Sequence, residues 1–159
     1  MSGLGLFDTS IEIRIPVPAP RRPATAEVSE ADFPVIFQIT RADLIADGSL
    51  IDVSEMAREA GFKIPVAISA GAWNDCVAWD DSDTNRQTHQ DQSGRLWDVL
   101  WMAMVAARNS RNTSIIRFPL LRVPRDGRSR EAEETTLKSI ISGGDNGEPV
   151  ITILLPHED

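Results

Sequence analysis

The chain has 159 residues, of which 42% are hydrophobic and 25% charged, so it is long enough for one globular domain with a core of its own. Its net charge of −8 disfavours a general nucleic-acid-binding protein, and its single cysteine, Cys76, excludes an internal disulfide or a thiolate zinc cluster. No apolar run approaches the roughly 18 residues of a membrane span and the start lacks a signal-peptide pattern, so we expect a cytoplasmic protein without a membrane partner.

Residues 1–32 are rich in proline. Four prolines fall within eight residues, namely Pro16, Pro18, Pro20 and Pro23. Proline cannot donate a helical hydrogen bond and favours extended polyproline geometry, so we expect a flexible arm. Within it, residues 11–17 alternate apolar and polar types and could add an edge strand or dock as a short peptide. A single globular domain is expected over residues 33–159.

The next part of the chain, residues 33–80, predicts an apolar strand followed by three short helices. The strand is expected over residues 33–39. Capping-box spacing starts the first helix at Thr40 and Asp43 and the second at Asp52 and Glu55. The second helix is expected to end at Gly61, before an extended segment over residues 63–68. Ser69 then caps a third helix that continues to Asp80.

The strongest predicted element is an amphipathic helix over residues 88–108. Large apolar residues recur there at helical spacing, namely Leu96, Trp97, Leu100, Trp101 and Met104. This spacing predicts a core-facing stripe that contains both tryptophans. Thr88 is the expected N-cap, although Gly94 would also allow a start at Ser93. The preceding residues, 80–87, are expected to form a polar loop.

Beyond Arg111 the apolar spacing becomes that of strands. Three runs rich in β-branched residues are separated by turn-forming sequences, and they span residues 114–124, 135–141 and 149–156. Pro119 places the first run at a sheet edge or a bulge. We therefore expect an α+β fold, with a three-stranded or slightly larger antiparallel meander at the C-terminal end packed against two or three amphipathic helices.

Four motifs run through these elements, and they are TRADLIADGSLIDVSEMAREAGFKIPVA, WNDCVAW, QDQSGRLWDVLWMA and LLRVPRDGR. Together they resemble an uncharacterised family of bacterial proteins found on plasmids and other mobile elements, with a likeness that covers residues 34–156. The resemblance implies a genomic setting, in which conjugation, regulation or evasion of host defence are common tasks, and it implies no reaction.

Charge is distributed unevenly along the chain. Nine carboxylates against two basic residues lie between Asp43 and Asp83, whereas seven arginines against one aspartate lie between Arg108 and Arg130. We expect these opposite charges to pair in part within the fold. The alternative is a dipolar surface that attracts a charged partner.

Two clusters of polar residues are candidates for function. Asp80, Asp81 and Asp83, with His89 and Asp91 nearby, could hold a hard cation or transfer protons, although their spacing matches no calcium loop. Arginines around the predicted hairpin tip could bind phosphate or a carboxylate-rich protein, and they are Arg122, Arg125, Arg128 and Arg130.

Two further residues are candidates for a reactive or an exposed group. Cys76 lies on the apolar face of its helix with Trp73, so we expect a buried core residue rather than a nucleophile. Trp79 lies off that face, so it is the tryptophan expected to be exposed and to contact a partner.

These observations favour a non-enzymatic accessory protein that binds a protein partner, such as a host-defence or regulatory protein, through charged surfaces. The residues expected to make this contact are Trp79, Asp80, Asp81, Asp83, Arg122, Arg125 and Arg128. One alternative is a small metal-dependent enzyme with a polar site around residues 80–91. Another is a nucleic-acid-associated regulator that uses the arginine hairpin, residues 122–130. We expect no cofactor and no resident metal, and the oligomeric state is open.

Overall fold

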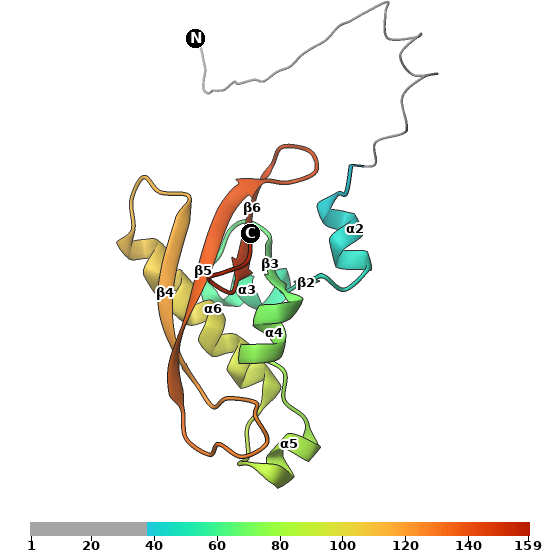
Figure 1. The fold of residues 1–159 in the computed structure, drawn as a ribbon. Coiled ribbons are helices and arrows are strands. Elements are labelled where there is room, and N and C mark those ends of the chain that lie inside the picture. Colours follow the sequence, from blue (N-terminus) through green and yellow to red (C-terminus); the bar gives the residue numbers. More distant parts are fainter. Residues whose placement is uncertain (1–37) are drawn as a thin grey trace, which may run out of the picture. The chain divides into compact units, whose positions relative to one another are not determined.

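A five-stranded mixed sheet organises the fold of the computed structural model, which describes residues 38–159 (Figure 1). Its strands are β2 (Leu50–Asp52), β3 (Val66–Ser69), β4 (Ile115–Arg122), β5 (Glu133–Gly143) and β6 (Pro149–Leu154). They are arranged in the order β2-β3-β6-β5-β4. The predicted antiparallel meander is present as β4, β5 and β6. The prediction of a purely antiparallel sheet is wrong, because β3 pairs in parallel with β6 and antiparallel with β2.

The positions of the strands agree with the sequence in two respects. Pro119 lies in β4, which is an edge strand as the proline predicts. The extended segment predicted over residues 63–68 contains most of β3. The predicted proline-rich arm, its docking segment 11–17 and most of the strand predicted over residues 33–39 lie outside the described residues.

In the described residues, five helices connect or cover the strands. They are α2 (Arg41–Ala46), α3 (Ser54–Ala60), α4 (Ala70–Cys76), α5 (Asp81–Arg86) and α6 (Gln92–Asn109). The predicted caps at Thr40 and Ser69 are confirmed, because each side chain accepts the backbone N–H three residues ahead. The capping box predicted at Asp52 is wrong, since Asp52 ends β2 and Val53 is the N-cap of α3. The helix that begins after Ser69 ends at Cys76, four residues earlier than predicted.

Gly61 terminates α3 in the left-handed conformation, at φ 114°, as the sequence predicts. We expect Gly61→Ala to lower the free energy of unfolding by about 1–2 kcal/mol, because a Cβ is disfavoured at positive φ. Gly94→Ala in the first turn of α6 is the matched control. There an added Cβ would meet only the Asp91 side chain, at 3.5 Å, so this change should stabilise the protein by about 0.5–1 kcal/mol. Urea denaturation of both variants measures the difference.

The tryptophan helix, α6, begins at Gln92. Its N-cap is Asp91, whose Oδ2 accepts the N–H of Gly94 at 3.0 Å, so the cap predicted at Thr88 is wrong and the later start is nearer the structure. The buried face of α6 carries Arg95, Leu96, Val99, Leu100, Ala103 and Met104. Trp97 and Trp101 are 36% and 43% exposed, so the prediction that both belong to the core is wrong. No helix of residues 38–159 has the length and apolarity that crossing a bilayer requires.

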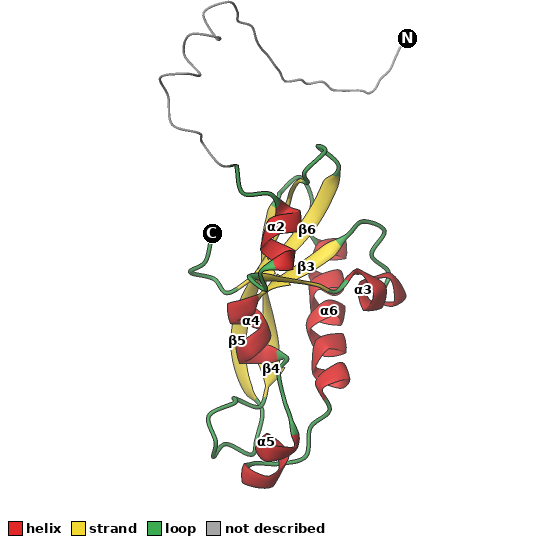
Figure 2. Ribbon diagram, turned by 90° about the vertical axis from the view of Figure 1, so that its right-hand side faces the viewer, coloured by secondary structure: helices red, strands yellow, loops and turns green. Residues whose placement is uncertain are grey.

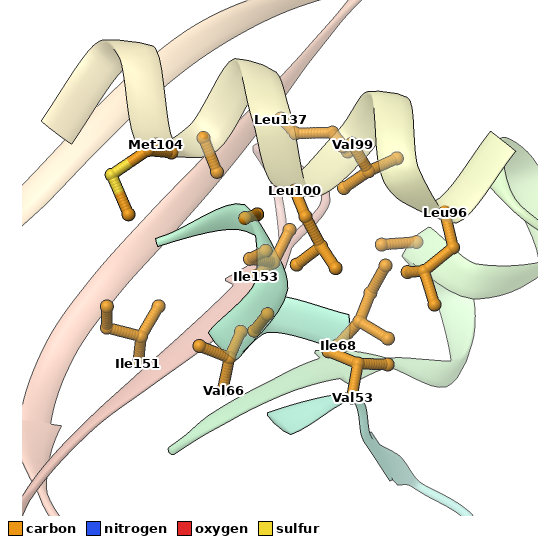
Figure 3. Packing of buried hydrophobic residues seen from close by; sticks show 14 of the residues in the cluster. Val53, Val66, Ile68, Leu96, Val99, Leu100, Met104, Leu137, Ile151 and Ile153 are labelled. Atoms are coloured by element: carbon orange, nitrogen blue, oxygen red, sulfur yellow. The ribbon is translucent and has the colours of Figure 1, made fainter. Parts of the chain in front are cut away.

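The main core lies between α6 and one face of the sheet (Figure 2). Alternate residues of the paired strands point to this face, so that Phe118 lies opposite Leu137, and Ile153 lies between Ser139 and Ile68. Figure 3 shows Val99, Leu100 and Met104 of α6 above Val66 and Ile68 of β3 and Ile151 and Ile153 of β6. Helices α3 and α4 complete the same cluster with Ala57, Ala60, Ala72 and Cys76. Helix α6 packs against the sheet next to β4. One side of the helix therefore lies beside this edge strand.

Candidate functional site

The acidic residues predicted to lie in a polar loop form a helix. Asp80 is the N-cap of α5, its Oδ1 accepts the N–H of Asp83, and the Asp83 carboxylate accepts the N–H of Asp80, both at 2.9 Å. This is a capping box made of two aspartates, so the expectation of a loop over residues 80–87 is wrong. The spacing of Asp80 and Asp83 was visible in the sequence, but the segment has no apolar stripe to mark a helix.

Asp83 is the centre of an ion-pair network that joins α5 to the loop between β4 and β5. Its buried carboxylate accepts from Arg125 Nε at 2.8 Å and from Arg86 at 3.0 Å, and Arg125 also lies 3.4 Å from Asp80. Burial acts to raise the pKa of Asp83, but hydrogen bonds from Asp80 and Arg125 outweigh it and hold the pKa below its usual value. The predicted pairing between the acidic and the basic segments is therefore confirmed here.

Gln87 reinforces this junction through its amide. Its Nε2 donates to the carbonyl oxygens of Pro124, at 2.7 Å, and Ser129, and its Oε1 accepts the N–H of Gly127 at 3.0 Å. Three backbone groups of the loop are satisfied by one buried side chain. Sequence reasoning missed Gln87, because a lone glutamine carries no pattern that links it to a loop about 40 residues away.

The other charged candidates divide into paired and exposed groups. Arg122 donates to the Asp75 carboxylate at 3.2 Å. Arg128 is 88% exposed and lies 3.9 Å from Asp126, and Asp81 is also exposed. The structure thus brings Asp80, Asp83 and Arg125 together at one junction, where Asp83 is buried and Asp80 is exposed, and leaves Asp81 and Arg128 facing solvent.

Trp79 is buried, at 5% exposure, so the prediction that it faces solvent is wrong. Its indole N–H donates to Thr84 Oγ1 at 3.1 Å, and the Arg95 guanidinium lies 4.6 Å from the ring centroid. The prediction assumed that a helix continues past Cys76. The chain leaves helical geometry there and turns the ring inward.

Cys76 is 1% exposed, as predicted for a core residue. Burial raises the pKa of its thiol to about 12, and the neighbouring Asp75 carboxylate adds to the effect. We expect a colorimetric thiol reagent to label Cys76 at least about 100-fold more slowly in the native protein than in 6 M guanidinium, because reaction requires the thiolate and access to it. Equal rates at pH 8 would contradict this environment.

Within residues 38–159, no three His, Cys, Asp or Glu side chains gather closely enough to hold a metal ion. The Asp80 and Asp83 oxygens are engaged by backbone N–H groups and Arg125, and His89 is exposed outside that network. The geometry of residues 80–91 is therefore that of a structural junction.

A groove of about 350 Å³ lies between α6 and the edge strand β4. Its lining consists of Asp98, Trp101, Met102, Pro119, Leu120, Leu121 and Glu134. Beside it, the rings of Trp97 and Trp101 stack with their centroids 6.1 Å apart and their planes 16° from parallel. Leu121, on the strand side, is 66% exposed. Exposed apolar side chains thus border the groove from both elements.

Comparison with known proteins identifies the family of this chain but does not identify an activity. A model described as a family of unknown function, DUF6573, matches residues 29–159. The chain belongs to DUF6573. The prediction of an uncharacterised family is confirmed by this match, which includes every helix and strand described above. Comparison of this DUF6573 chain with curated proteins and with solved structures found no match.

The open edge of β4 offers backbone hydrogen-bonding groups beside the groove of this DUF6573 member. The Ile141 N–H donates to the Ser114 carbonyl at 2.8 Å, which turns the even-numbered residues of β4 toward β5. The odd-numbered residues therefore direct their backbone groups outward. Pro119 is one of them, so its missing N–H removes no bond from the sheet.

Two carboxylates give the groove a negative lining. Asp98 and Glu134 form no ion pair within residues 38–159. Burial raises the pKa of Asp98 above its usual value, and the nearby Arg95 opposes this shift. A cation placed beside Asp98 would offset the energetic cost of desolvating its charge, so the groove favours a ligand that is apolar and positively charged.

Proposed function

We propose that this protein is a non-enzymatic interaction module that binds an extended segment of a protein partner in the groove between α6 and β4. The observation that carries the proposal is the stacked, solvent-exposed pair Trp97 and Trp101 beside that groove. Tryptophan is enriched among the residues that dominate binding energy, and large exposed apolar patches mark interaction sites.

The lining of the groove defines the chemistry of the partner. An apolar side chain would contact Met102 and Leu121, and a neighbouring lysine or arginine would pair with Asp98 or Glu134. The same cation could lie over the face of Trp101, which adds a cation–π interaction. The partner segment is therefore basic and apolar, which complements a protein of net charge −8.

Such a segment would be held by pairing as an additional strand with the open edge of β4. An added strand would bond the outward N–H and C=O groups of Arg117 and Leu121, and its side chains would lie over the groove. A second copy of β4 fits less well, because both strands would then lack the donor at Pro119.

The resemblance to plasmid-borne proteins supports an accessory role on a mobile element, with a host-defence or regulatory protein as the partner. Asp81 and Arg128 remain exposed at the α5 end and could add charged contacts. The metal-dependent and nucleic-acid alternatives gain no support from the geometry, since Asp80 and Asp83 of the first pair with Arg125 of the second.

Site-specific photo-crosslinking tests the proposal in producing cells. A photoreactive phenylalanine analogue placed at Trp97 should form a discrete adduct with a protein partner. The same analogue at Ile39, which is 70% exposed and is not among the groove residues, should not form that adduct. Trp101→Ala should weaken the captured interaction at least about 30-fold, while circular dichroism shows an unchanged fold. Identical adducts from both positions, or none from Trp97, would refute the proposal.

A further inference from the structure

Arg95 is a buried cation without a carboxylate partner in the described part of the chain. It is 5% exposed and forms no ion pair within residues 38–159. Its Nε and one terminal nitrogen donate to neutral oxygens, namely Val77 O at 3.1 Å, Gln90 Oε1 at 3.1 Å and Val123 O at 3.0 Å. Its other terminal nitrogen, Nη2, is buried and has no hydrogen-bond partner. Buried N–H groups of a charged residue are rarely left unpaired.

Arg122 presents a second unused donor. One of its terminal nitrogens bonds both oxygens of Asp75 at 3.2 Å, whereas its buried Nε has no partner. The residue comes from the end of β4, and Arg95 comes from the first turns of α6. Two elements distant in sequence therefore bring unsatisfied guanidinium groups to one place.

Both arginines line a single small cavity of about 20 Å³. The rest of its lining is Cys76, Gln90, Asp98, Leu120 and Leu121. A volume of this size holds one water or one monoatomic ion and is too small for phosphate, sulfate or a carboxylate.

The charge around the cavity favours an anion. Arg122 is already paired with Asp75, so the positive charge of Arg95 is the one without a contacting counter-charge among the described residues. Asp98 lines the cavity and opposes an anion, but it makes no ion pair with either arginine. Trp79, which lies over the guanidinium, compensates the charge only in part. We propose that this cavity binds one chloride ion, held by Nη2 of Arg95 and Nε of Arg122.

The proposal is tested by anomalous diffraction from crystals of the full chain grown with sodium bromide in place of chloride. An anomalous peak between the two arginine nitrogens supports a halide site. A feature of water size without anomalous signal, or the Asp98 side chain turned into the cavity, would overturn it. This result does not depend on any variant or on the groove's partner.

Thermal unfolding gives a second readout in solution. At constant ionic strength, replacing sodium gluconate with sodium chloride should raise Tm by about 2–4 °C, because an anion that binds only the native state stabilises it. Arg122→Met should abolish this rise. Arg117→Met, which removes an exposed arginine from the same strand, should retain it. A Tm that does not respond to chloride in the unmodified protein would contradict the assignment.

Discussion

Replacing Leu100 by alanine is expected to lower the free energy of unfolding by about 2–5 kcal/mol. Leu100 has no exposed surface and lies at the centre of the contact between α6 and the sheet (Figure 3). Truncation leaves a cavity that the surrounding core side chains cannot fill without moving. Urea denaturation followed by circular dichroism measures the change.

The adjacent residue supplies the control. Trp101 is larger than Leu100, but 43% of it is exposed and it lies beside the groove. Trp101→Ala should therefore lower stability by only about 1 kcal/mol or less, while it weakens partner binding. Similar losses of stability in the two variants would contradict the burial of Leu100 and the exposure of Trp101 on α6.

Asp83→Asn is expected to destabilise the protein by about 2–4 kcal/mol at pH 7. The substitution keeps the size of the side chain but removes the charge that pairs with Arg125 at 2.8 Å. It also weakens the capping interaction with the Asp80 N–H. Arg86 contributes little to this effect, because more than half of its side chain is exposed. Denaturation at pH 7 measures the loss, with Asp81→Asn, at the exposed neighbouring aspartate, as the control.

The same substitution should change how stability depends on pH. The folded pKa of Asp83 lies below its usual value of 3.8, so its stabilising charge is fully present above that value and is lost as the pH falls through the folded pKa. The difference between the unmodified protein and Asp83→Asn should therefore be constant from pH 5 to 7 and shrink below about pH 4. A difference that grows on acidification would contradict a depressed pKa.

The sequence predicted that α6 is a helix, but it did not predict correctly which of its residues are buried. Its apolar residues form two overlapping stripes, one through Leu96 and Leu100 and the other through Trp97 and Trp101. Both have helical spacing, so periodicity alone does not decide which stripe faces the sheet. The prediction places both stripes in the core, whereas the structure buries the aliphatic one and leaves Trp97 and Trp101 partly exposed. The sequence therefore does not reveal the candidate groove, because Trp101, which lines it, is predicted to lie in the core.

The sequence also did not predict which distant segments of the chain pair with each other. The β4–β5–β6 meander follows from local strand runs and turns, and Pro119 marked its edge. By contrast, β2 has three residues, and the parallel pairing of β3 with β6 joins segments more than 80 residues apart. The contacts of Asp83 with Arg125 and of Gln87 with the 124–129 loop are also distant in sequence. Charge counts predicted that pairing would occur but did not identify the partners.

The position of β6 has a consequence for biosynthesis. Residues 149–154 lie between β3 and β5, so the two halves of the sheet have no strand to join them until this segment has left the ribosome. The pairing of β6 with β3 also joins segments more than 80 residues apart. Completion of the sheet therefore waits for a contact between distant segments, so it should be slower than formation of the local β4–β5 hairpin.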